Sequence, residues 1–332
     1  MSLSSATTQI RRSGRPAALL MVLAPLLAEV LGGATPLTLF LNPVTFLSYA
    51  VFLYGLPLLV IREIATRAGL GTLSLWCLGA VYGLYNEGLL SETLYHPLDH
   101  QIPAYFSYGL VAELRIPWML YILPWHGLLS VVMPILFTER LMPASAGIPW
   151  FPKRVTWVLG AFVVLFGVTR FLFAGEDRVS NGGVVLLHFG FVAGLVVVLC
   201  LAARRLRSAV RLIPDVDRDA PVWRPVVAGA ACYLATFVGL QALAELSVPW
   251  LLFVLYFTAI AVVAVWAFAH LREVTRTAAT RFLLGTGLAE ATVAVVFGLL
   301  TVTVLWAIAG VLFGAVFVIA LFRLNPRGPR SL

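Results

Sequence analysis

The sequence predicts an all-α protein, a polytopic transmembrane helix bundle of about ten spans with both termini in the cytoplasm. Hydrophobic residues make up 61% of the chain and charged residues only 11%, which is too little polar surface for a water-soluble domain of this length. Apolar runs of roughly 20 residues, the length of a spanning helix, recur along the whole chain. We therefore expect one transmembrane domain over residues 1–332.

The individual spans follow from these runs. We expect them near residues 16–33, 44–66, 71–93, 117–138, 154–174, 183–203, 224–247, 249–270, 279–300 and 303–324. The stretch from Phe282 to Phe322 is about twice as long as one span requires, so a tight reversal is expected near residues 301–303. Nine spans, without that reversal, is the alternative.

Arginines between alternate runs set the orientation, because positive charge marks the cytoplasmic side of a span. The inner group includes Arg15, Arg67, Arg140, Arg205 and Arg276, and the outer exceptions are Arg115, Arg170 and Arg178. Arg323 joins the inner group only if the number of spans is even, which favours ten. The net charge of +8 is thus a topology signal, and we expect membrane lipids, not nucleic acid, as partners.

The start of the chain and the amino-acid composition indicate the location. The first run lacks a small-residue cleavage site and leads into Glu29, so we interpret it as a retained span and not as a signal peptide. Lys153 is the only lysine beside many arginines, which is typical of a GC-rich bacterial genome. We expect a multi-pass protein of the bacterial cytoplasmic membrane.

Polar side chains are concentrated in residues 1–140, whereas residues 150–332 read as mostly apolar supporting helices. An ionisable group at membrane depth costs several kcal/mol unless it is paired, protonated or hydrated, and so marks a candidate site. In the expected topology Glu29, Glu87 and His126 lie in the outer halves of three different spans. We predict that these three residues and Asn86 form a catalytic site that opens outward.

Several neighbours complete this candidate site. Ser91 lies four residues after Glu87 and Ser130 four after His126, so each pair shares a helix face. Aromatic side chains flank both motifs. The expected substrate-binding residues are Tyr82, Tyr85, Ser91, Glu92, Trp125 and Ser130.

Other polar residues have a structural interpretation. Arg62 and Glu63 are expected to pair at the cytoplasmic end of the second span, and Glu92 and Glu139 to lie at span ends. His188, Glu245, His270 and Glu290 are isolated. The carboxylates of the candidate site itself could also be protonated and simply bonded to a neighbouring helix.

We expect no metal and no cofactor. His96, Asp99 and His100 are ligand types that zinc uses, but Pro97 breaks the helix that would align them. Cys77, Cys200 and Cys232 show no metal-type spacing. Phosphate-loop, dinucleotide and His-Glu-x-x-His motifs are also missing from the sequence.

Two segments, Gly83-Leu-Tyr-Asn-Glu-Gly-Leu-Leu-Ser-Glu and Trp125-His-Gly-Leu-Leu-Ser, are similar to those of uncharacterised prokaryotic multi-span proteins. They distantly resemble the CAAX-protease and bacteriocin-processing (CPBP) intramembrane peptidases. The resemblance implies that Glu87 is a general base and that His126 binds water or steadies an oxyanion. Asn86 stands where that family has a first glutamate, and Ser91 falls near the position of its basic residue.

Three functions fit these features. The first is a membrane-embedded hydrolase that acts on a lipidic or membrane peptide substrate, with Glu87 activating water. The second is an isoprenoid- or lipid-acting cyclase or transferase, in which Glu87 is an acid and aromatic side chains shield a carbocation. The third is a proton-coupled transporter or an accessory membrane subunit.

Overall fold

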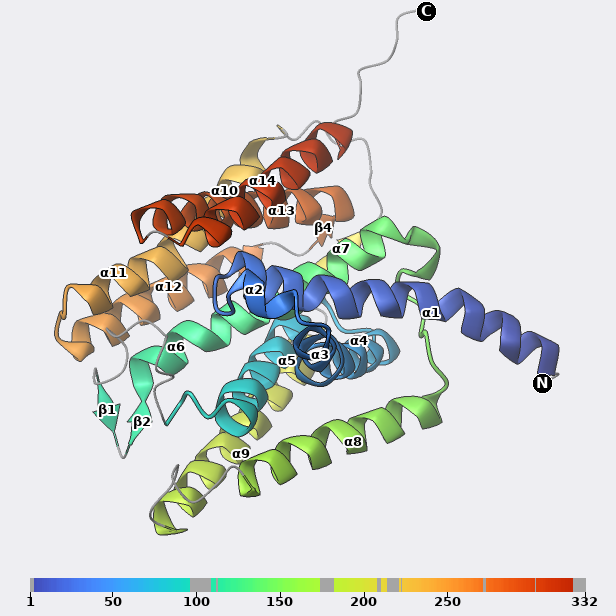
Figure 1. Cartoon of the computed structure of the whole chain (residues 1–332), viewed down its shortest axis with the longest axis horizontal. Coiled ribbons are helices and arrows are strands. Elements are labelled where there is room, and N and C mark those ends of the chain that lie inside the picture. Colours follow the sequence, from blue (N-terminus) through green and yellow to red (C-terminus); the bar gives the residue numbers. More distant parts are fainter. Residues whose placement is uncertain are drawn as a thin grey trace, which may run out of the picture.

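The computed structural model describes residues 3–95, 109–111, 113–173, 182–207, 210–213, 221, 223–270, 273–301 and 303–324. Within them the chain is an all-α bundle with two small strand pairs (Figure 1). Among the residues that the structure describes, eight helices are long and apolar enough to cross a membrane. The predicted fold class, a multi-span helix bundle, is thereby confirmed.

The first half of the chain contains the helices that carry the candidate site. Its elements are α1 (Leu3–Pro25), η1 (Leu26–Leu31), α2 (Leu37–Phe40), α3 (Pro43–Leu47), η2 (Ser48–Leu53), α4 (Gly55–Ala68), α5 (Thr72–Tyr85), η3 (Asn86–Leu90), β1 (Leu110–Val111), β2 (Leu114–Arg115), α6 (Ile116–Trp125), η5 (His126–Val132), α7 (Met133–Leu141) and η6 (Pro143–Ser145). Here η1, η2, η3 and η5 are π-helical turns that continue the neighbouring α-helices.

The elements of the second half are α8 (Lys153–Leu172), α9 (Gly182–Arg205), β3 (Arg211–Ile213), α10 (Trp223–Tyr233), η7 (Leu234–Val238), α11 (Gly239–Glu245), α12 (Trp250–His270), β4 (Glu273–Thr275), α13 (Arg276–Leu300) and α14 (Val304–Leu324). Of these, α8 and α9 lie on one side of the first-half group, at the bottom of Figure 1, and α10 to α14 lie on the other side, at the top. Helix α13 ends at Leu300 and α14 begins at Val304, so the predicted reversal near residues 301–303 is confirmed.

Two expected spans are not among the eight. Residues 72–90 form the helix α5–η3, whose hydropathy is lowered by Asn86 and Glu87, and α12 counts only as a shorter apolar helix, Trp250–Ala264. Both segments are helical, but their length and composition alone do not identify them as spans.

Helix α5 is the central element of the first half. It packs against α4, α6, α9 and η5, and it buries Leu75, Ala80 and Tyr82. Gly79 makes this packing close, because a Cβ placed there would lie 2.7 Å from the Cα of Gly127 in η5. The approach of α5 to η5 brings Glu87 and His126 to the same level.

Replacing Gly79 by alanine is therefore expected to lower the free energy of unfolding by about 1–3 kcal/mol, because an added methyl overpacks this contact. Thermal unfolding of the purified protein in detergent measures the effect. Gly190→Ala in α9 is the control, since nothing lies within 4 Å of its added Cβ. Equal stability of the two variants would contradict the close approach.

Candidate functional site

Every residue of the predicted catalytic set lies on a π-helical turn. Glu29 is in η1, Asn86 and Glu87 are in η3, and His126 is in η5. Such turns are rare, they insert one extra residue into a helix, and they occur frequently at functional sites. The α-helical period assumed from the sequence is thus interrupted where the polar side chains face the bundle interior.

Glu87 and His126 are in direct contact. His126 Nε2 lies 2.8 Å from Glu87 Oε1, and His126 Nδ1 lies 2.9 Å from Ser130 Oγ. The His126 side chain is only 1% exposed and that of Glu87 only 9%. The two ring nitrogens of His126 thus contact different partners, Nε2 the Glu87 carboxylate and Nδ1 the Ser130 hydroxyl. Ser130 therefore holds the ring, and the ring holds Glu87.

The other carboxylate oxygen of Glu87 faces the segment that follows η3. The Thr93 hydroxyl donates to Oε2, and Ser91 Oγ lies 3.3 Å from the same atom. Thr93 in turn accepts a hydrogen bond of 3.0 Å from Trp118 Nε1 on α6. Sequence reasoning missed Thr93 and Trp118, because Thr93 lies beyond the helix end, where periodicity no longer places a side chain.

This segment is shaped by backbone contacts. Leu94 N donates to Glu87 O over 3.2 Å, and Glu92 adopts a φ of 58°. Arg115 donates to Thr93 O over 3.4 Å, and burial lowers the pKa of its guanidinium from the ordinary value. The chain thus folds back over the end of η3 and covers Glu87.

Glu29 forms a second hydrogen-bonded group beside the first. Thr35 Oγ1 donates to its Oε2 over 2.6 Å, and the Tyr54 hydroxyl donates to its Oε1. Packed aromatic rings connect the two groups: Tyr54 and Tyr82 centroids are 5.7 Å apart, and the Tyr82 and His126 rings meet edge to face at 5.3 Å. Glu29 adjoins the Glu87–His126 pair through these rings.

A cavity of about 320 Å³ lies beside the Glu29 group, between η1, α2 and the start of α14. Thr35, Gly33 and Trp306 line it, and the Trp306 indole donates to Leu31 O over 2.9 Å. The sequence led us to expect an outward pocket between Glu87 and His126. The structure instead closes that contact and places a cavity next to the hydroxyl that binds Glu29.

The predicted substrate-binding residues divide into two groups. Tyr82 and Trp125 both pack their rings edge to face on His126, and Ser91 and Ser130 bind the pair directly. Tyr85 points elsewhere, because its hydroxyl donates to Val163 O of α8 over 3.0 Å.

Two polar residues near Glu87, Asn86 and Glu92, are buried. Asn86 is 4% exposed, and its Oδ1 has no hydrogen-bond partner among the described residues. Glu92 was expected at a span end, yet it is 1% exposed and lies 3.8 Å from Arg170 Nη1. The buried Oδ1 of Asn86 is an acceptor to which a water molecule or a substrate can donate a hydrogen bond.

The predicted Arg62–Glu63 pair, in the second half of α4, is confirmed. Arg62 Nη1 lies 3.0 Å from Glu63 Oε1. The pair belongs to a larger network, since Arg62 also lies 2.8 Å from Glu139 and Glu63 lies 3.1 Å from Arg67. Glu139 is partly buried by this contact. We interpret the network as structural.

Glu290 on α13 is a buried carboxylate within residues 150–332, which were expected to form mostly apolar helices. Its side chain is 1% exposed, and both carboxylate oxygens lack a partner in the part of the chain that the structure describes. Its isolation in the sequence made it look structural, and that interpretation stays a prediction.

The possible metal ligands His96, Asp99 and His100 lie outside the described residues. Within the described ranges, no group of three or more histidine, cysteine, aspartate or glutamate side chains is placed to hold a metal ion.

Comparison with known proteins identifies a family to which the chain belongs. No curated protein and no solved structure matches the chain. Residues 18–324, nearly the whole described bundle, match the model of one protein family. This multi-pass membrane protein therefore belongs to an uncharacterized membrane protein family.

Proposed function

We propose that this protein is a membrane-embedded hydrolase in which Glu87 is the general base. The observation that carries the proposal is the 2.8 Å contact between Glu87 Oε1 and His126 Nε2. A carboxylate that is held by an imidazole, and flanked by a buried amide oxygen without a partner among the described residues, is arranged to orient one further molecule such as water.

In the proposed reaction, Glu87 takes a proton from water while the oxygen attacks a carbonyl carbon, and the same proton then passes to the leaving group. His126 is a positioning residue, because its Nε2 is bound to Glu87 and its Nδ1 to Ser130. This role differs from the water- or oxyanion-binding role that the CPBP resemblance implies. The matching family is described only as an uncharacterized membrane protein family, so the proposal depends on this geometry.

The surrounding side chains favour a lipidic or membrane peptide substrate. Tyr82 and Trp125 line the pair with aromatic surface, and the cavity beside Thr35 provides an approach near Glu29. On the other side of Ser130, α7 and the end of η5 bury Val131, Val132, Met133 and Ile135. This apolar packing favours a site that substrate reaches from one side only. It argues against a polar path that continues through the bundle, as a transporter would need.

Incorporation of oxygen from water tests the proposal while the substrate is still unidentified. Membranes that contain the protein are incubated in H₂¹⁸O, and extracted lipids and peptides are compared by mass spectrometry. We expect ¹⁸O-labelled products with the wild type and a loss of at least about a hundredfold in Glu87→Gln. Glu245→Gln, the same change at an exposed glutamate, is the control.

The outcomes separate the three functions. Equal labelling by Glu87→Gln and the wild type would overturn the hydrolase proposal. Rearranged lipids that depend on Glu87 but gain no oxygen would instead indicate acid chemistry. If neither kind of product depends on Glu87, the result would favour a transporter or an accessory subunit.

We further propose ten spans, with both termini cytoplasmic, in a bacterial cytoplasmic membrane. Helices α5–η3 and α12 supply the two spans beyond the eight that length and composition identify. Green fluorescent protein fused at either end is expected to fluoresce, whereas alkaline phosphatase at the same positions is expected to be inactive. An active phosphatase at the C-terminus alone would show an odd number of spans.

A further inference from the structure

Glu290 places a carboxyl group in the interior of the second half of the bundle. It is the fifteenth of the 25 residues of α13, which puts it about 21 Å along the helix axis from the first residue and about 15 Å from the last. Helix α13 is one of the segments that are long and apolar enough to span a membrane. The carboxyl therefore lies near the middle of the apolar layer, where an unpaired charge is strongly unfavourable.

No hydrogen bond within the described part of the chain balances this carboxyl. The Glu290 side chain is buried, and both of its oxygens lack a hydrogen-bond partner among the described residues. Thr286 lies one turn earlier on α13, but its hydroxyl donates to Gly229 O of α10 over 3.2 Å. The donor closest to Glu290 along its own helix is thus already bound to a backbone carbonyl.

The helices on two sides of Glu290 pack closely on α13. Gly229 of α10 and Gly285 of α13 permit this contact, because a Cβ at either position would collide with the backbone of the other helix. On the side of α14, a Cβ at Gly287 would lie 2.6 Å from the Phe317 ring. This packing keeps water away from the Glu290 carboxyl.

Two tyrosines face Glu290 from neighbouring helices. The Glu290 carboxyl interacts electrostatically with Tyr233 of α10 and with Tyr121 of α6. Both rings pack on Phe237, with centroid distances of 5.1 Å for Tyr233 and 5.8 Å for Tyr121. Tyrosine hydroxyls are neutral below about pH 10, so they provide no charge to pair with a carboxylate. Glu29 in η1, which also contacts α13, is bound within the candidate site.

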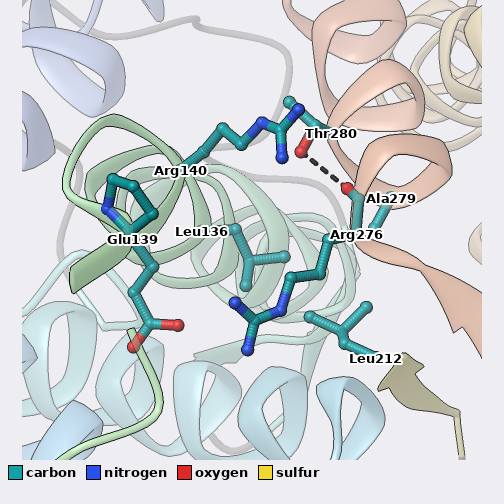
Figure 2. A pocket seen from close by; sticks show the side chains of 8 residues that line it. Leu136, Glu139, Arg140, Leu212, Arg276, Ala279 and Thr280 are labelled. Atoms are coloured by element: carbon teal, nitrogen blue, oxygen red, sulfur yellow. Dashed lines mark hydrogen bonds between the residues drawn. The ribbon is translucent and has the colours of Figure 1, made fainter. Parts of the chain in front are cut away.

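The charged side chains around α13 lie at its other end. Figure 2 shows this end, where Arg276 lies near Glu139 and Arg140 of α7 around a cavity of about 40 Å³. Arg281 is nearer to Glu290 along the helix, yet it is still nine residues, or about 13 Å, away. The neighbouring elements contribute further charged residues to the same end: Arg211 in β3, Arg224 at the start of α10, Glu273 in β4 and Arg323 at the end of α14.

We propose that Glu290 binds a proton in the middle of the membrane and that this proton holds α13 against α6 and α10. In the packed bundle the group is a neutral carboxylic acid, and it loses its proton to water when these helices separate. The ligand is a proton and not a metal ion, because no group of three or more histidine, cysteine, aspartate or glutamate side chains in the described ranges is placed to hold one. The site uses neither Glu87 nor His126, so it is independent of the hydrolase proposal.

Infrared difference spectroscopy of the purified full-length protein at about pH 7 tests this proposal directly. We expect the wild type to show the C=O stretching band of a protonated carboxyl group that E290Q lacks. The matched control is E245Q, which removes an exposed glutamate. Because an exposed glutamate is ionised at this pH, E245Q should lose a carboxylate band and keep the acid band. An acid band of equal intensity in the wild type and E290Q would show that Glu290 is ionised and would overturn the proposal.

The pH dependence of unfolding in detergent is the second measurement. A glutamate in water is ionised above about pH 5, whereas Glu290 in the packed bundle keeps its proton, so the folded state is favoured at low pH and loses this advantage as the pH rises. Relative to E290Q, the unfolding equilibrium constant of the wild type should rise about tenfold per pH unit between about pH 6 and pH 8. E245Q should follow the wild type.

The other outcomes of these measurements count against the proposal. Parallel pH profiles of the wild type and E290Q would show that unfolding releases no proton from Glu290. Failure of E290Q to fold would also overturn it, since a neutral amide of the same shape should replace a neutral acid. Loss of the difference between the two profiles when sodium chloride replaces choline chloride would identify a bound metal cation instead of a proton.

Discussion

Replacing Arg62 by alanine is expected to lower the free energy of unfolding by about 3–5 kcal/mol, the usual cost of removing one partner from a buried ion pair. Arg62 is 1% exposed and binds both Glu63 and Glu139. It also donates to two carbonyls, Ile148 O at 2.6 Å and Ser145 O at 3.0 Å. Its loss removes the arginine donor of Glu139 and of both carbonyls, and leaves Glu63 with only Arg67 and Trp150 N.

Arg62 also binds the segment that connects α7 and α8. Its guanidinium lies 3.9 Å from the Trp150 ring centroid, and Trp150 N donates to Glu63 Oε1 over 2.6 Å. Chemical or thermal unfolding in detergent measures the change, and limited proteolysis after residue 141 reports release of this connection. Arg154→Ala, an exposed arginine of α8, should stay within about 0.5 kcal/mol of the wild type. A similarly small effect for Arg62→Ala would show that the network is dispensable.

Replacing His126 by leucine is expected to lower the free energy of unfolding by about 3 kcal/mol, because it leaves the buried Glu87 Oε1 without its donor. Ser130 Oγ loses its partner in the same variant. Since His126 is 1% exposed, water does not readily replace the lost contacts. Unfolding in detergent again measures the change.

A double-mutant cycle separates the pair from general packing effects. Glu87→Gln, His126→Leu and the combined variant are compared with the wild type. We expect a coupling energy of about 1–3 kcal/mol, since the two side chains touch and share one network. A coupling energy close to zero would mean that the 2.8 Å contact makes no net contribution, and it would also weaken the assignment of His126 as the positioning residue.

Much of the bundle could be predicted because the bilayer imposes simple rules. A spanning helix needs a minimum apolar length, and that rule alone located helices such as α8 and α14. The reversal between α13 and α14 followed from length as well. The span expected near residues 71–93 differs, because Asn86 and Glu87 reduce the hydropathy of α5–η3, which is not among the helices that length and composition identify.

The residues of the candidate site could be proposed from the sequence, but most of the contacts between them could not. Periodicity correctly paired Ser130 with His126, because residues four apart share a face even where the helix widens. It could not show that Tyr85 turns toward α8, or that Thr93 returns to Glu87. Those positions depend on how one helix is rotated against another and on where a loop leads.

The sequence by itself determined that this protein is a multi-pass helical bundle and that its candidate site residues Glu29, Glu87 and His126 lie in the first half. Apolar length and the cost of charge in lipid are local properties, so they can be read along the chain. Only the tertiary structure decided that Glu87 touches His126, that Arg62 binds Glu139, and that Arg140 and Arg276 line one cavity. These contacts join residues tens of positions apart, and packing between helices, which no local pattern encodes, brings them together.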